Sequence, residues 1–248
     1  MVRRRYGLRM DARVLLGVWA LTAIAVTGCS QSRDCARLAE VANRRSAEIA
    51  QIENRQSTTP QTLATDMEAL SGVADQVVQD IEALNLSDGP LAEQASRYAD
   101  NARALSKATQ DFSTLMDTLE GRRDEDRKTE AAFEKTGRSL LDACATASAA
   151  CNDVGDVLRA QPENPEPDAQ LEVLGTYTDA LEALELEDGP VATAVNARVK
   201  ATKDYTAMLV GRAALDDDIE AARTKIHDIV DAQNALITEL NTTCAGKD

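Results

Sequence analysis

Residues 81–92 read IEALNLSDGPLA, and residues 181–192 read LEALELEDGPVA. The two stretches lie one hundred residues apart, and both place Asp-Gly-Pro between two apolar helical patterns. Glycine tolerates the backbone conformation that ends a helix, and proline presets the first turn of the next one. Each stretch therefore predicts a helix, a tight turn and a second helix.

The similarity between the two copies continues beyond the turn without a gap. Duplication of one segment is the simplest explanation of this constant spacing. Seven residues of the first copy recur as the same residue type one hundred positions later. They are Leu115, Asp117, Glu120, Arg123, Ala132, Leu140 and Cys144, and their counterparts in the second copy are Leu215, Asp217, Glu220, Arg223, Ala232, Leu240 and Cys244.

Apolar residues recur three and four positions apart along most of the chain, which is typical of a helix with one buried face. Aromatic residues make up 3% of the sequence, and the Gly and Pro residues cluster between the apolar patterns. This composition favours long helices over sheets. We therefore predict an all-α protein with seven helical patterns, over residues 35–52, 63–84, 91–116, 133–158, 171–184, 191–209 and 219–244.

Each copy contains Asp-x-x-Glu, from Asp117 to Glu120 and from Asp217 to Glu220, which is the spacing of a helix-starting capping box. We predict a hairpin at both places. The chain then forms tandem antiparallel bundles over residues 35–147 and 148–248, which share the long helix through 133–158. The alternative is a spectrin-like arrangement with one unbroken helix of roughly 55 residues in each copy.

The first thirty residues have a different character. Five arginines within residues 1–28 all precede an apolar run, VLLGVWALTAIAV at 14–26, which is too short to span a bilayer. The run ends in Val26-Thr27-Gly28-Cys29, which resembles the lipobox of bacterial lipoproteins. The resemblance implies a signal peptide over 1–28, lipid on the sulfur of Cys29, fatty acyl chains such as palmitate, and a tether over 29–34. The alternative is an ordinary export signal that contains a cysteine.

The residue after the lipid cysteine is Ser30 rather than aspartate. By the same resemblance, this favours the outer membrane, facing the periplasm, in a Gram-negative cell.

The net charge of the chain is −15, and loss of residues 1–28, with five arginines and one aspartate, leaves −19. Such a surface repels phosphate backbones, so we expect no nucleic-acid partner. A membrane contact through the lipid and a second envelope protein are the partners we expect.

Four cysteines remain after Cys29, and an even number in an oxidising compartment predicts disulfides. From the bundle topology we predict the pairs Cys35–Cys144 and Cys151–Cys244. Cys144 and Cys151 lie seven residues apart, so on one helix they cannot bond to each other without breaking it. Free thiols packed as small apolar groups are the alternative.

No group of residues points to catalysis, and we expect no metal and no cofactor. The single histidine, His227, has no triad or second metal ligand around it in the sequence. The run 216–218 lacks the rest of a calcium loop, so we expect it to cap the last helix.

Three functions follow from these observations. The first is a non-catalytic scaffold or interaction module that offers acidic helical faces to another envelope protein. The second is a carrier or sensor of a small ligand, with a cavity among the alanines of 143–150 or one lined by Tyr177 and Tyr205. The third, an enzyme, has the least support, because numerous acids make any chosen pair uninformative.

Overall fold

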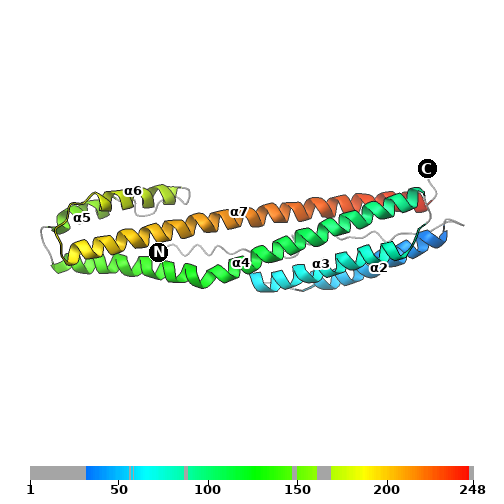
Figure 1. The fold of residues 1–248 in the computed structure, drawn as a ribbon, viewed down its shortest axis with the longest axis horizontal. Helices are drawn as coiled ribbons and strands as arrows, with labels where there is room; N and C mark the ends of the chain where they lie inside the picture. Colours follow the sequence, from blue (N-terminus) through cyan, green and yellow to red (C-terminus); the bar gives the residue numbers. More distant parts are fainter. Residues whose placement is uncertain are drawn as a thin grey trace. The chain divides into compact units, whose positions relative to one another are not determined.

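The computed structural model describes residues 32–245 except residues 56, 58, 87–88, 147–149 and 161–168. Within these ranges the chain forms six helices and no strand, which confirms the all-α prediction. The helices are α2 (Ser32–Glu53), α3 (Pro60–Ala83), α4 (Pro90–Thr146), α5 (Ala150–Arg159), α6 (Gln170–Glu182) and α7 (Pro190–Cys244) (Figure 1). Among these six, none combines the length and the apolar character needed to cross a bilayer.

Three of the described helices, α3, α4 and α7, begin at the predicted proline residues. The Thr59 hydroxyl accepts a hydrogen bond from the backbone N–H of Thr62 and so caps α3. Pro90 and Pro190 begin α4 and α7. Gly89 has a φ of +146°, which residues with a Cβ rarely adopt, so the turn before α4 requires glycine.

The hairpins predicted at Asp117 and Asp217 are wrong. Both residues lie inside continuous helices, α4 with 57 residues and α7 with 55, as in the alternative of one unbroken helix per copy. A capping box needs a break in the backbone as well as the two side chains. Residues 112–120 and 212–220 contain no Gly or Pro, so the helical hydrogen bonds continue through both. The run 216–218 therefore caps nothing.

The long helix predicted through 133–158 is wrong as well. It divides into α4, which ends at Thr146, and α5, which begins at Ala150. The heptad pattern alone did not reveal this break, because the apolar spacing of α5 follows that of α4.

The helices pack into two compact units, each a helical bundle. Among the described residues, unit 1 contains those up to Glu120 and those from Asp217 onward, and unit 2 contains Gly121–Asp216. Each long helix therefore contributes to both units. The predicted division into residues 35–147 and 148–248 follows the sequence repeat rather than the packing, and it stays a prediction.

The core of unit 1 takes side chains from α2, α3, the first part of α4 and the last part of α7. They are the apolar residues that the heptad pattern marks and their neighbours on the same faces. Burial of such side chains stabilises a fold by about 1.5–3 kcal/mol each for the larger ones. The cluster comprises Leu38, Val41, Val77, Val78, Ile81, Leu84, Ala95, Tyr98, Ala99, Ala102, Leu236, Ile237 and Leu240.

Tyr98 makes the stability of the protein sensitive to alkaline pH. Burial raises the pKa of this phenol, and a hydrogen bond with Gln233 opposes that shift in part. The unfolded phenol ionises near pH 10 while the folded one stays neutral, so the contribution of Tyr98 to the free energy of unfolding is constant below about pH 10 and falls above it. Denaturant unfolding at pH 9 to 11 is expected to show this decline. Tyr98→Phe is expected to reduce its slope, and an unchanged slope would contradict the assignment.

The core of unit 2 also takes side chains from four helices. Here they come from the last part of α4, α5, α6 and the first part of α7. The cluster comprises Leu140, Val154, Tyr177, Leu181, Val191, Ala194, Val195 and Val199.

Candidate functional site

All four cysteines of the described residues form disulfides. Cys35 bonds to Cys244 and Cys144 bonds to Cys151, with Cα–Cα distances of 5.7 and 5.3 Å. The predicted pairs Cys35–Cys144 and Cys151–Cys244 are therefore wrong, although each cysteine is in a disulfide.

The break between α4 and α5 explains the different pairing. On one continuous helix, Cys144 and Cys151 would lie about 10 Å apart along the axis. Because α4 ends and α5 begins between them, their Cα atoms approach to disulfide distance. In unit 1, Cys35 near the start of α2 meets Cys244 at the end of α7, which the predicted hairpins had assigned to the second bundle.

The predicted lipid site lies outside the described residues. The signal segment 1–28, Cys29 and residues 30–31 of the predicted tether are not described. Residues 32–34 of the predicted tether belong to the first turn of α2. Cys35 follows Cys29 by six residues, so the Cys35–Cys244 disulfide is close in the chain to that site.

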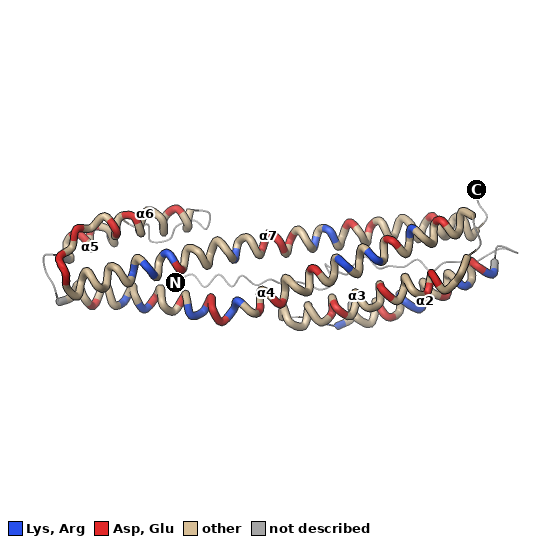
Figure 2. Tube along the Cα trace, viewed as in Figure 1, with Lys and Arg blue, Asp and Glu red and all other residues tan. Residues whose placement is uncertain are grey.

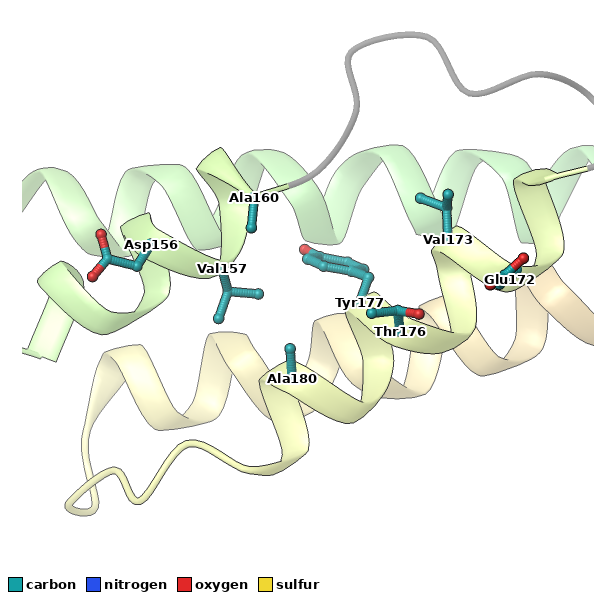
Figure 3. Close-up of a pocket in the computed structure, with 8 residues that line it drawn as sticks. All are labelled: Asp156, Val157, Ala160, Glu172, Val173, Thr176, Tyr177 and Ala180. Carbon is teal, nitrogen blue, oxygen red and sulfur yellow. The ribbon is translucent and has the colours of Figure 1, made fainter.

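A pocket of about 400 Å³ lies in unit 2 between α5 and α6. Its volume is within the range of small-molecule sites. Figure 3 shows the Tyr177 ring reaching from α6 toward α5, with Asp156 toward one side of this view and Glu172 toward the other. The lining residues are Asp156, Val157, Ala160, Glu172, Val173, Thr176, Tyr177 and Ala180.

Arg198 fixes the position of Tyr177 from the side of α7. Arg198 is 9% exposed, and its Nε donates to the Tyr177 hydroxyl at 3.2 Å. The guanidinium carbon lies 3.6 Å from the centre of the Phe133 ring, and a guanidinium nitrogen donates to the Phe133 carbonyl. The Phe133 ring in turn stacks on Tyr205 with centroids 4.4 Å apart. These contacts give the pocket one rigid aromatic wall.

Arg198→Met is expected to lower the free energy of unfolding by about 2 kcal/mol, because it leaves the buried Tyr177 hydroxyl without its donor. Lys200→Met on the same helix is the matched control. Lys200 is exposed and pairs with Asp204 at 2.7 Å, an interaction that contributes only about 0.3–0.5 kcal/mol. Urea unfolding measures both, and equal losses would contradict the role given to Arg198.

Acidic residues dominate the surface of α6 and the turn that follows it. Figure 2 shows acidic and no basic positions along this segment. Glu182 pairs with Lys203 of α7 at 2.6 Å. Residues 169–197 contain no Lys, Arg or His and six acidic residues, which are Glu172, Asp179, Glu182, Glu185, Glu187 and Asp188.

The remaining polar residues singled out from the sequence do not converge on a common site. His227 is half-buried on α7 in unit 1, and Asp217 and Asp218 are exposed on the same helix. Over the ranges that the structure describes, no three His, Cys, Asp or Glu side chains come together as metal ligands would.

The sequence analysis found one residue of the pocket but not the pocket itself. A cavity lined by Tyr177 and Tyr205 was the feature that would favour the carrier hypothesis; Tyr177 lines this pocket, while Tyr205 instead stacks on Phe133. Neither Ala143 nor Ala145 lines it, and residues 147–149 lie outside the described part. The pocket depends on the break after Thr146, which lets α5 turn back beside α6, and no sequence pattern signalled that break.

Comparisons of the chain with known protein families, with curated proteins and with solved structures find no match.

Proposed function

We propose that the protein is a lipoprotein of the bacterial cell envelope, held by lipid on Cys29, and that its helical part is a non-catalytic module that binds another envelope protein. The observation that carries this proposal is the pair of disulfides. Structural disulfides form in oxidising compartments outside the cytoplasm. They agree with an export signal, and the lipobox resemblance supplies the anchor.

The position of Cys35 supports a bundle held at one end. Cys35 lies in the first turn of α2, which begins at Ser32, so three residue steps separate Cys29 from the helix, and these span at most about 11 Å when fully extended. Lipid on Cys29 therefore keeps the Cys35–Cys244 end of unit 1 close to the bilayer surface. The acidic surface along α6 in unit 2 suits a partner with a basic surface and disfavours an anionic membrane.

Membrane fractionation with mass spectrometry tests the anchor. We expect the protein in the membrane fraction, with fatty acyl groups on a peptide that begins at Cys29, and we expect Cys29→Ala in the soluble fraction. An unmodified Cys29 in the purified protein would overturn the proposed lipid anchor.

Crosslinking in intact cells, followed by capture and mass spectrometry, tests the acidic surface. The variant carries Asp179→Asn, Glu185→Gln and Glu187→Gln in unit 2. The matched control carries the same number of neutralised exposed acids in unit 1, namely Glu40→Gln, Asp75→Asn and Glu93→Gln. A partner lost only with the first variant supports the proposal, and a partner lost equally with both contradicts a specific surface.

We further propose that an internal duplication produced the two units as tandem bundles. A shift of one hundred residues relates α4 to α7 and Cys144 to Cys244. Each of these cysteines lies near the end of a long helix and bonds to a cysteine near the start of a shorter one, Cys151 in α5 or Cys35 in α2. Peptide mapping without reduction is expected to recover these two bridges, and a Cys35–Cys144 peptide would contradict their equivalence.

A carrier or sensor of a small ligand is the second candidate, favoured by the pocket between α5 and α6. Its apolar residues and its rigid Tyr177 wall are typical of a binding site rather than of a packing defect. A rise in melting temperature with a bound small molecule is the expected result for this candidate.

A further inference from the structure

The chemistry of the pocket between α5 and α6 indicates what kind of molecule it takes. Most of its lining is aliphatic or aromatic, with Val157, Ala160, Val173, Ala180 and the Tyr177 ring. These side chains suit an apolar body. Its two ionisable lining residues, Asp156 and Glu172, are both acids, and no Lys or Arg lines it among the described residues.

The two acids differ in their partners. Asp156 forms an ion pair with Arg159 at 2.5 Å, so its charge is balanced within α5. Glu172 has no Lys or Arg partner within the described part of the chain, and residues 169–197 around it contain no basic residue. Glu172 is therefore the carboxylate that is open to a cation entering the pocket.

The nearest buried cation does not reverse this preference. Arg198 lies behind Tyr177, where its donors are directed to the Tyr177 hydroxyl and the Phe133 carbonyl, and it does not line the pocket. A ligand carboxylate in the pocket would therefore meet Asp156 and Glu172 with no Lys or Arg among the described lining residues to balance its charge.

We propose that this pocket binds a small organic amine, with its apolar body between α5 and α6 and its ammonium group at the Glu172 carboxylate. This inference rests on the second candidate function, the small-ligand carrier, and adds the class of ligand to it.

Three probes of similar size and different charge test the proposal: 2-phenylethylamine, 2-phenylethanol and 3-phenylpropanoate. Binding is measured by calorimetry on the full chain as the host cell processes it. We expect the amine to bind more tightly than the alcohol and the alcohol more tightly than the carboxylate. Glu172→Gln is expected to weaken the amine by about two- to fivefold, as for a partly exposed ion pair, and to leave the alcohol unchanged. Asp179→Asn, on α6 but outside the lining, is the matched control.

A variant that fills the pocket locates the binding. Ala180→Phe from α6 is expected to abolish amine binding, and Ala160→Phe makes the same test from α5 if the first variant folds poorly. Binding that survives both variants would place the amine elsewhere and overturn the proposal. Equal binding of amine and alcohol, or tighter binding of the carboxylate, would overturn the ligand class while the carrier function stands. Binding of none of the probes would count against both.

Discussion

Replacing both Cys35 and Cys244 with serine is expected to lower the free energy of unfolding by about 5 kcal/mol, the loop-closure entropy of a bridge between residues 209 apart. The free energy falls because the unfolded chain gains the conformations that the bridge forbids. Denaturant unfolding under non-reducing conditions measures the loss.

The second disulfide supplies the matched control. Cys144→Ser with Cys151→Ser opens a loop of residues only 7 apart, for which the same relation gives about 2.5 kcal/mol. The first double variant should therefore be the less stable one. Equal losses would contradict the pairing, because with the bridges Cys35–Cys144 and Cys151–Cys244 each double variant would remove one cysteine from both bridges and so break both.

Thr118→Pro is expected to destabilise the protein by about 3 kcal/mol or more, the usual cost of proline in a helix interior. Thr118 lies exposed inside α4, so the substitution disturbs the backbone and little packing. The proline removes the hydrogen bond to the carbonyl of Thr114 and its ring clashes with that group. Far-UV circular dichroism and urea unfolding measure the loss of helix and of stability.

The same substitution separates the observed helix from the hairpin. In a hairpin capped by Asp117, position 118 is the first helical residue, where proline is favoured. A stable Thr118→Pro variant would therefore support the hairpin. Thr118→Ala controls for loss of the side chain, and Asp218→Pro repeats the test at the corresponding place in α7.

Local signals in the sequence predicted the parts of the fold that local physics decides. Thr59 with Pro60 starts α3, and Gly89 with Pro90 starts α4, because capping and backbone conformation depend on adjacent residues. The heptad positions in α3 are buried for the same reason: the spacing along one helix fixes which face is apolar.

The long-range arrangement did not follow from these signals. Asp117 and Glu120 have the spacing of a capping box, but the same residues are equally stable on the exposed face of a helix, so the spacing did not distinguish a hairpin from continuity. The end of α4 at Thr146 was hidden because the apolar pattern continues into α5. The wrong disulfide pairs and the unforeseen pocket both result from the wrong predictions at Asp117 and at the end of α4.

The Cys35–Cys244 bond has a consequence for proteolysis. It joins residue 35 to residue 244, so nearly all of the helical chain lies within one covalent ring. A protease that cuts once at any peptide bond between these two cysteines opens the ring but releases no fragment. Two cuts are needed before a piece can diffuse away, and a piece that contains either cysteine stays attached until the disulfide is reduced. A nicked molecule thus keeps all of its residues and both of its ends, and it gains only one water for each cut.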